Sequence, residues 1–285
     1  MTHEPRDVPE AATERAVPDP DNPPWGFWEA LGLMLVSFVL MLLMFGVFIV
    51  PYAVYRGVGL LGFAEFATKD PGALLVQVLS ILPAHLITLG LAWLVVTRAG
   101  KYPFFRTLGW DWRAGFTLWR SVGLAVLLLV VGIVIGLLTG PSDNALEQLI
   151  RSSRAATLAV AFVASVSAPL VEEVVFRGVL YSALRRLAGT AGAVVCVVFI
   201  FAVIHVPQYL PSYGVIATIL LLSIALTLIR ARSRGLLPCF IVHLVYNSIQ
   251  AVYMVIEPYL ERLTTREAAP APGLLVELFA RLFGG

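Results

Sequence analysis

Three groups of polar residues interrupt apolar stretches in the second half of the chain. They are Glu172 and Glu173 with Arg177, Phe201 with His205, and His243 with Asn247. A carboxylate, two imidazoles and a carboxamide that converge in a water-poor pocket suit the hydrolysis of an amide, although another acyl hydrolysis would fit the same groups. The first expectation from this sequence is therefore a hydrolytic site built from these residues.

The spacing within each group indicates which side chains point together. Glu173 and Arg177 lie four residues apart, so on a helix they share one face and can form an ion pair. Glu172 lies about 100° further around that helix and is free to point elsewhere. His243 and Asn247 repeat the four-residue offset. They can therefore address one point from one helix.

Each side chain has a possible role in such a site. Glu172 can take a proton from water, and Asn247 can donate a hydrogen bond to the oxyanion that develops. His205 and His243 can bind a metal ion or position the water. We interpret Phe201, one helical turn before His205, as a packing residue that shapes the pocket.

Simpler interpretations exist for each residue taken alone. The pair of Glu173 and Arg177 could be a structural ion pair, and either His205 or His243 could form a hydrogen bond between helices. The joint occurrence of the three groups favours a site, because a charge near the bilayer centre costs about 2.5–3.5 kcal/mol and usually faces a cavity or a partner. His85 belongs to none of the groups, and we interpret it as a packing or cavity residue.

The composition indicates what surrounds these residues. The 285 residues are 59% hydrophobic and 13% charged, with a mean hydropathy of +0.87, which is far more apolar than a soluble domain. We therefore expect an integral, multi-pass membrane protein. The net charge of +2 includes no long basic run, which argues against nucleic acid as a partner. Cys196 and Cys239 lack a disulfide or metal-binding spacing, and we interpret them as packing residues.

Apolar runs predict the helices that position the three groups. They cover about 27–55, 73–97, 117–139, 156–187, 190–206, 213–230 and 236–256. The fourth run is too long for one straight span, because about 32 residues give about 48 Å against a hydrocarbon core of about 30 Å. Pro169 is expected to kink or restart it. We therefore predict an all-α transmembrane bundle of about seven spans, or eight if a short helix precedes Pro169.

The fourth and fifth runs are expected to be antiparallel neighbours that turn near Gly189. Glu172 lies 17 residues before Gly189 and His205 lies 16 residues after it, so both sit about 25 Å from the turn and can face each other. His243 lies eight residues beyond Gly235, or about 12 Å from its own turn. The sequence leaves this difference in depth unresolved.

Loop charges predict the orientation of the bundle. Lys and Arg concentrate after the second, fourth and sixth runs, at Arg98, Lys101, Arg106, Arg113, Arg120, Arg185, Arg186, Arg230, Arg232 and Arg234. Positive charge marks the cytoplasmic side, so these loops and the N-terminus are expected there, in a bacterial cytoplasmic membrane. Tryptophans at run ends are interpreted as an interfacial belt: Trp25, Trp28, Trp110, Trp112 and Trp119.

These patterns divide the chain into four segments. Residues 1–24 are acidic and Pro-rich and are expected to form a disordered tail. Residues 25–150 form N-terminal transmembrane helices, and residues 151–258 form the transmembrane core that carries the three polar groups. Residues 259–285 form a C-terminal tail, in which 274–283 is expected to be an interfacial amphipathic helix.

In order and spacing, the three groups resemble the CAAX protease and bacteriocin-processing family of intramembrane peptidases, also called the Abi family. The family's EExxxR, FxxxH and HxxxN motifs match Glu172 to Arg177, Phe201 to His205 and His243 to Asn247. The resemblance covers about 155–256 and implies an endopeptidase of membrane-associated or prenylated protein or peptide substrates. In eukaryotic members, the last three residues after a prenylated Cys are removed. The resemblance implies a catalytic set of Glu172, Glu173, His205, His243 and Asn247, supported by Arg177 and Phe201.

Two mechanisms are open for this family, one in which Glu and His activate water without metal and one in which zinc is bound. Glu172, His205 and His243 would supply three zinc ligands and leave a fourth position open, so we expect zinc, with the metal-free mechanism as the alternative. Two other functions compete with a peptidase. A non-catalytic scaffold or bacteriocin-immunity protein would tolerate Glu172→Gln, and a proton-coupled transporter should show paired repeats that are not found in this sequence.

Overall fold

The computed structural model of the protein describes residues 17–140 and 145–267, and within these ranges it contains helices and no strand. The predicted all-α architecture is confirmed. The elements are α1 (Phe27–Tyr55), η1 (Leu60–Gly62), α2 (Phe63–Lys69), α3 (Pro71–Thr97), α4 (Phe104–Thr107), α5 (Leu118–Thr139), α6 (Ala145–Ser152), α7 (Arg154–Phe162), η2 (Val163–Ser167), α8 (Ala168–Glu172), η3 (Glu173–Leu180), α9 (Tyr181–Tyr209), α10 (Tyr213–Ser233) and α11 (Leu237–Glu267). Of these, η1 is a 3₁₀ helix, and η2 and η3 are π-helical.

Six helices in the described part of the chain are long and apolar enough to cross a membrane. One of them, Arg154–Tyr209, has 56 residues and is not a single pass. Gly189 interrupts it with φ 70° and ψ 179°. The rings of Phe176 and Phe201 lie 5.3 Å apart, whereas a straight helix would separate them by about 38 Å. The chain therefore reverses at Gly189, as predicted, which divides this candidate span into two antiparallel segments and leaves seven such segments among the described residues.

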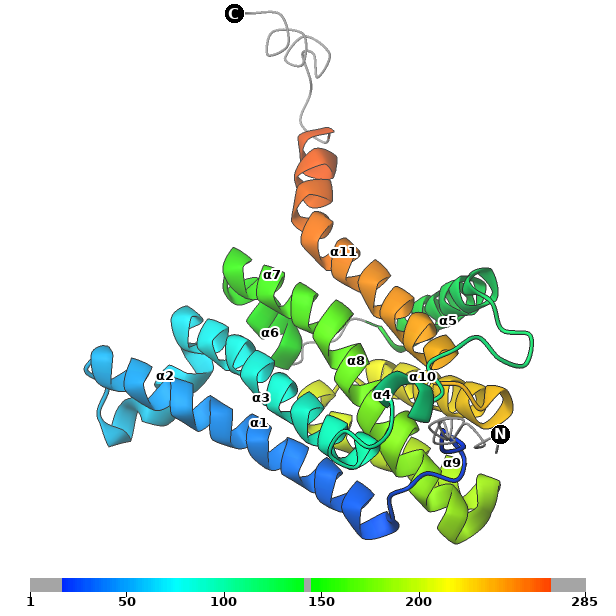
Figure 1. Ribbon diagram of the computed structural model, residues 1–285. Coiled ribbons are helices and arrows are strands. Elements are labelled where there is room, and N and C mark those ends of the chain that lie inside the picture. The colour runs from blue at the N-terminus through cyan, green and yellow to red at the C-terminus, as the bar shows by residue number, and fades with distance from the viewer. Residues whose placement is uncertain (1–16, 141–144, 268–285) are drawn as a thin grey trace, which may run out of the picture.

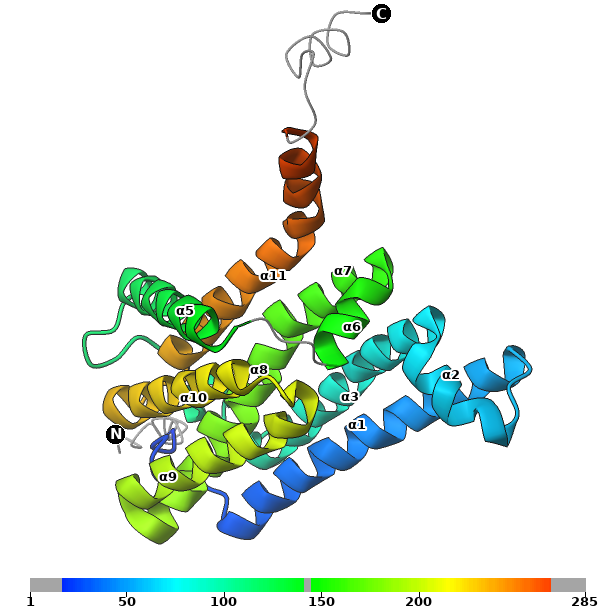
Figure 2. The same ribbon diagram turned by 180° about the vertical axis from the view of Figure 1, so that it is seen from behind.

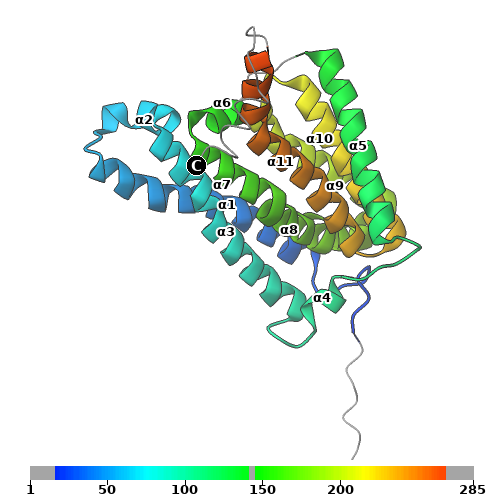
Figure 3. The same ribbon diagram turned by 90° about the horizontal axis from the view of Figure 1, so that it is seen from above.

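The helical stretch 154–188 lies in the middle of the bundle and is called the central helix below (Figure 1). On one flank it packs against α1 and α3, which lie side by side. On the other flank lie α5, α10 and α11 (Figure 3). After Gly189 the rest of α9 runs back beside α10 (Figure 2). The three polar groups therefore come from the central helix, the second half of α9, and α11.

Side-chain caps fix where several helices begin. Asp70 accepts a hydrogen bond from the N–H of Ala73 at 2.9 Å, and Pro71 occupies the first turn of α3. Ser153 accepts a hydrogen bond from the N–H of Ala156 at 3.1 Å. Such caps satisfy backbone donors that have no partner inside the helix. Ser153 thereby sets the start of the central helix, on which the glutamates lie.

The turn between α10 and α11 is recessed toward the middle of the bundle. Gly178 of η3 packs there so closely that a Cβ atom would lie 3.0 Å from Leu108 and 3.3 Å from Leu236. Gly178 precedes Gly189 by eleven residues, about 16 Å along a helix. The α10–α11 turn therefore begins well inside the level of the α9 turn. This recess resolves the difference in depth and brings His243 level with the glutamates of the central helix.

The positively charged loops gather at one end of the bundle, as predicted. Arg185, near the end of the central helix, and Arg234, just after α10, both form ion pairs with Asp21. Arg230 is not the loop charge that the sequence suggested, because it lies within α10 and is fully buried. The cytoplasmic location of this end stays a prediction.

The prediction of a disordered tail was wrong for residues 17–24. Asp21 is 6% exposed and the adjoining Trp25 is 1% exposed, so this segment packs against the bundle. Trp25 is therefore a core residue and not part of an interfacial belt. The physical reason is that Asp21 pairs with arginines of the bundle, of which Arg230 is fully buried. The predictions for residues 1–16 and for the helix 274–283 lie outside the described residues.

Candidate active site

The central helix changes geometry where it carries the two glutamates. Glu172 ends α8 and Glu173 begins η3, while η2 lies just before Pro169. Proline has no N–H to donate to the carbonyl four residues earlier, and a wider π turn directly before it accommodates the missing bond. Such π turns are rare and are frequent at functional sites. The predicted kink at Pro169 is therefore present as a widening of the helix.

Glu173 is fully buried and is held by two side chains. Its Oε1 accepts a hydrogen bond from Arg177 Nη1 at 3.2 Å, which is the pair expected from their spacing. The same oxygen lies 2.8 Å from Nδ1 of His243, whose side chain is 3% exposed. A carboxylate accepts hydrogen bonds, so Nδ1 of His243 carries a proton, and in the neutral ring the lone pair is then on Nε2. Glu173 therefore fixes the tautomer and ring orientation of His243.

Helices α9 and α10 complete the surroundings of Arg177. Ser223 accepts a hydrogen bond from Nη2 at 2.9 Å, and Thr227 accepts one from Nε at 3.4 Å. The guanidinium carbon lies 4.2 Å from the ring centroid of Phe201, a cation–π contact worth about 2 kcal/mol in a desolvated site. Arg177 is thus locked beside Glu173. Sequence reasoning missed Ser223 and Thr227, although their four-residue spacing in an apolar run is a readable polar stripe.

Glu172 faces the other nitrogen of His243. Its Oε2 lies 3.7 Å from Nε2, which is too long for a direct hydrogen bond, but a water about 2.8 Å from both atoms would bridge them. The side chain of Glu172 is 23% exposed, whereas that of Glu173 is 0% exposed. The two neighbouring glutamates therefore have different environments, because Glu173 is enclosed and positions His243, whereas Glu172 is partly exposed.

His205 and His243 both contact the ring of Phe201. The ring centroid of Phe201 lies 4.6 Å from that of His205 and 6.3 Å from that of His243. Nδ1 of His205 lies 2.6 Å from the carbonyl oxygen of Phe201. A carbonyl oxygen only accepts, so Nδ1 carries a proton, and in the neutral ring the lone pair is then on Nε2. Phe201 therefore packs against both imidazoles, in agreement with its interpretation as a packing residue.

Asn247 lies one helical turn beyond His243 on α11. Its Nδ2 donates a hydrogen bond to the carbonyl oxygen of Ala164 in η2 at 2.8 Å, which ties α11 to the central helix. A carboxamide has two N–H donors and one acceptor oxygen. One N–H group of Asn247 is therefore left for another acceptor, which is what its expected role toward an oxyanion requires.

The expected zinc site is only partly assembled. Among the residues that the structure describes, no three His, Cys, Asp or Glu side chains are grouped closely enough to hold a metal ion. Glu172 and His243 come together, but the described contacts bring His205 to neither of them. The three ligands that the zinc prediction requires are therefore not brought together in this arrangement. The chemistry below therefore uses the side chains alone, and zinc binding stays a prediction.

A further buried polar pair lies beside the site. Nδ1 of His85 on α3 lies 3.0 Å from Oγ of Ser167 at the end of η2, and His85 is 7% exposed. This contact fastens α3 to the π turn that precedes the glutamates. The sequence singled out His85 but gave no signal for its partner, because the two residues are 82 positions apart.

The part of the chain that carries the three polar groups matches a known protein family. Residues 154–249 match the family model for type II CAAX prenyl endopeptidase, Rce1-like. Over these residues the chain is similar to the Rce1-like family, as the three motifs predicted. The Rce1-like region spans the central helix, α9, α10 and the part of α11 with His243 and Asn247, so it contains all three polar groups. Comparisons with curated proteins and with solved structures give no match.

Proposed function

We propose that this protein is an intramembrane endopeptidase of the CAAX type that hydrolyses a peptide bond in a membrane-associated protein or peptide. One observation carries the proposal. Within the Rce1-like region, His243 lies between a buried carboxylate, Glu173 at 2.8 Å, and a more exposed one, Glu172 at 3.7 Å. A buried acid that orients an imidazole, with the free imidazole nitrogen toward a water-reachable carboxylate, can activate water for attack on an amide.

The proposed reaction starts with a water that bridges Glu172 and His243. Glu172 takes a proton as the water oxygen attacks the carbonyl carbon of the substrate, and that proton later passes to the leaving amine. The carbonyl oxygen becomes negative in the tetrahedral intermediate, and the free N–H of Asn247 donates to it. Glu173 holds His243 throughout. His205, with its lone pair on Nε2, orients the water or the substrate from beside Phe201.

The location of the site limits the substrate. The three polar groups lie in passes that are long and apolar enough to cross the bilayer, so a substrate must reach them from the membrane or its surface. The description of the matched family names prenyl endopeptidases. We therefore propose a substrate with a prenylated Cys near its C-terminus, and cleavage directly after that Cys.

This function is tested with purified protein in liposomes and two synthetic peptides of identical sequence that end in a CAAX motif, one farnesylated and one not. Mass spectrometry should show release of the last three residues from the farnesylated peptide by the wild type and not by Glu172→Gln. Equal release by the Glu172→Gln variant would contradict the proposal and favour a contaminating protease. If neither peptide is cleaved, a non-catalytic scaffold or immunity protein becomes the better interpretation.

The zinc prediction has its own test in the same assay. If zinc is held by Glu172, His205 and His243, a strong chelator should abolish cleavage and added zinc should restore it. Elemental analysis of the active preparation should then find about one zinc per chain. A fully active preparation without metal would reject the zinc prediction and leave the reaction of the side chains as described.

A further inference from the structure

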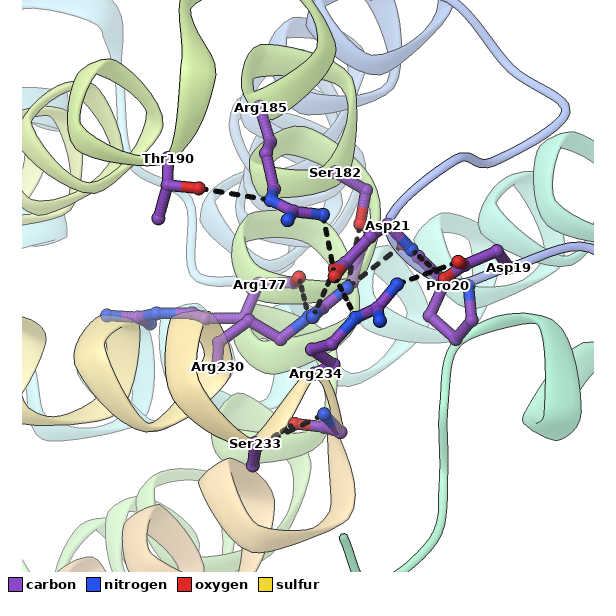
Figure 4. A network of polar contacts seen from close by, with 12 residues as sticks. Asp19, Pro20, Asp21, Arg177, Ser182, Arg185, Thr190, Arg230, Ser233 and Arg234 are labelled. Carbon is purple, nitrogen blue, oxygen red and sulfur yellow. Dashed lines mark hydrogen bonds and ion pairs between the residues drawn. The ribbon is translucent and has the colours of Figure 1, made fainter. Parts of the chain in front are cut away.

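Residues 17–25 lie outside the Rce1-like region but pack onto its charged end. Figure 4 shows this segment, with Asp21 surrounded by arginine side chains from the bundle. The buried Trp25 donates a hydrogen bond from Nε1 to the carbonyl oxygen of Val179 at 3.0 Å. Arg186 donates to the carbonyl oxygens of Pro23 and Trp25 at 2.9 and 3.2 Å. We call residues 17–25 the N-terminal strap.

Asp21 is the centre of the strap. Its carboxylate forms ion pairs with Arg230 at 2.9 Å, with Arg185 at 2.6 Å, and with Arg234. The Asp21 side chain is 4% exposed and that of Arg230 is 0% exposed. These arginines come from the central helix region, from α10 and from the turn after α10. One acidic side chain of the strap therefore joins the parts of the bundle that meet at this end.

Arg230 carries the link from the strap to the central helix. Its Nε donates to the carbonyl oxygen of Arg177 at 3.1 Å, and its Nη2 donates to Ser182 Oγ and to the carbonyl oxygen of Pro20, each at 3.0 Å. Nη1 faces Asp21. A buried guanidinium is rigid only while its donors are satisfied. Removing the charge of Asp21 would therefore leave the group that holds the backbone of Arg177 buried without its counter-ion, and weaken that hold.

The residue held in this way belongs to the active site. Arg177 fixes Glu173 from its side chain, and Glu173 in turn fixes His243. Trp25 holds a second carbonyl of the same π-helical element, that of Val179. The strap thus has two hydrogen-bonded links to η3, at backbone positions within two residues of each other. Both links come from outside the matched family region.

We propose that Asp21 is a positioning residue of the active site, which acts through Arg230 on the backbone of Arg177 and so sets the placement of Glu173 and His243. The N-terminal strap then contributes to the positioning of the active-site residues. This inference rests on the proposed peptidase function for its kinetic consequences. Its structural consequence, the ordering of η3, does not depend on that function.

The strap offers a matched control in Asp19. Asp19 is the same residue type two positions earlier, its side chain is 50% exposed, and it pairs with the equally exposed Arg234. It makes no bond to Arg230 or Arg185 among the contacts of the described residues. Asp19 Oδ1 also accepts a hydrogen bond from the backbone N–H of Asp21 at 2.9 Å, which the Oδ1 of asparagine can keep. Asp19→Asn therefore removes the same charge from the same segment and leaves the contacts of Arg230 with Asp21 and Arg177 in place.

The test compares wild type, Asp21→Asn and Asp19→Asn, all full-length and in liposomes, by cleavage kinetics and by hydrogen exchange of the amides of residues 173–180. We expect Asp21→Asn to lower kcat at least tenfold with KM changed less than twofold, and to speed exchange in 173–180 at least tenfold. Asp19→Asn should leave both unchanged, and Asp21→Glu should recover part of the lost kcat. A mere stabiliser would lower the unfolding temperature without changing kcat below it.

Two outcomes overturn the proposal. One is exchange in 173–180 that is the same in Asp21→Asn as in Asp19→Asn, and the other is a kcat for Asp21→Asn equal to that of the control. If Asp21→Asn does not fold, Trp25→Phe, which removes only the bond to Val179, must show faster exchange in 173–180 for the proposal to survive. An inactive wild type with the expected exchange would contradict the peptidase function and leave the positioning role in place.

Discussion

Two buried carboxylates, Glu173 in the middle of the bundle and Asp21 at its charged end, differ in the groups that compensate their negative charge. Asp21 is surrounded by arginines, which stay charged at every relevant pH. Glu173 has one arginine and one imidazole on Oε1, while its Oε2 has no hydrogen-bond partner among the described residues. A carboxylate with only permanent cations fastens helices together. A carboxylate beside a group that can gain and lose a proton supports chemistry.

The largest expected effect is on catalysis, and it comes from replacing Glu172 in the active site. Glu172→Gln keeps the shape of the side chain but removes the base, and we expect kcat to fall about a thousandfold, within the range for a general base. Cleavage of the farnesylated peptide measures this loss. The thermal unfolding midpoint should change little, because Glu172 is partly exposed and its contact with His243 is long, at 3.7 Å. A variant with more than a tenth of wild-type kcat would remove Glu172 from the mechanism.

A smaller loss is expected when the buried carboxylate at Glu173 is replaced. Glu173→Gln can still accept a hydrogen bond from His243 but no longer neutralises Arg177 or favours the proton on Nδ1. We expect kcat to fall about a hundredfold, because the wrong imidazole tautomer becomes populated. The ¹⁵N chemical shifts of His243, measured in labelled protein, report the tautomer directly. An unchanged tautomer together with reduced kcat would contradict the role assigned to Glu173.

The structural role of Asp21 is tested by measuring the stability of the protein. Asp21→Asn leaves the fully buried Arg230 without its charge partner, and breaking a buried pair in this way costs about 3–5 kcal/mol. Thermal unfolding in a fixed detergent should show a clear fall in the midpoint. Replacement of Arg230 by Met in the same protein should recover part of that loss, because the unpaired charge is gone. No recovery would show that the arginine is not the source of the cost.

The smallest effect is expected at Asp19, on the surface of the same segment. The backbone N–H of Asp21, and then Arg234, hold the pKa of Asp19 below its ordinary value near 3.8. A lowered pKa in the folded protein stabilises it above the unfolded pKa, and this contribution is lost as the pH falls through the folded pKa. Asp19→Asn should therefore cost less than about 1 kcal/mol at neutral pH, and nothing at pH values below the folded pKa. Unfolding midpoints at several pH values measure the difference.

Much of this arrangement follows from local spacing. The Glu173–Arg177 pair could be predicted because four residues make one helical turn. Counting residues from Gly189 predicted that the central helix and the second half of α9 lie side by side, and the contact between Phe176 and Phe201 agrees with it. The depth of His243 could not be predicted in this way. It depends on how closely Leu236 and Leu108 approach Gly178, which is a packing fact with no signature in the spacing of any one helix.

The partners of the arginines were also hidden from the sequence, for a different reason. Arg230 looked like a loop charge because it lies near the end of an apolar run, and Asp21 looked like part of a solvated tail because its neighbours are acidic and prolines. Their 209-residue separation carries no pairing signal. Only the tertiary structure shows that the charges of Asp21 and Arg230 offset the free-energy cost of burying one another.

The central claim, that Glu172 and His243 act together on one water, is tested most directly by a double-mutant comparison of single-turnover cleavage rates. The four proteins are wild type, Glu172→Gln, His243→Ala and the double variant. If the two side chains act as a unit, each single change should cost about a thousandfold and the double change less than tenfold more. Losses that multiply in the double variant would mean independent actions, and would contradict a shared site.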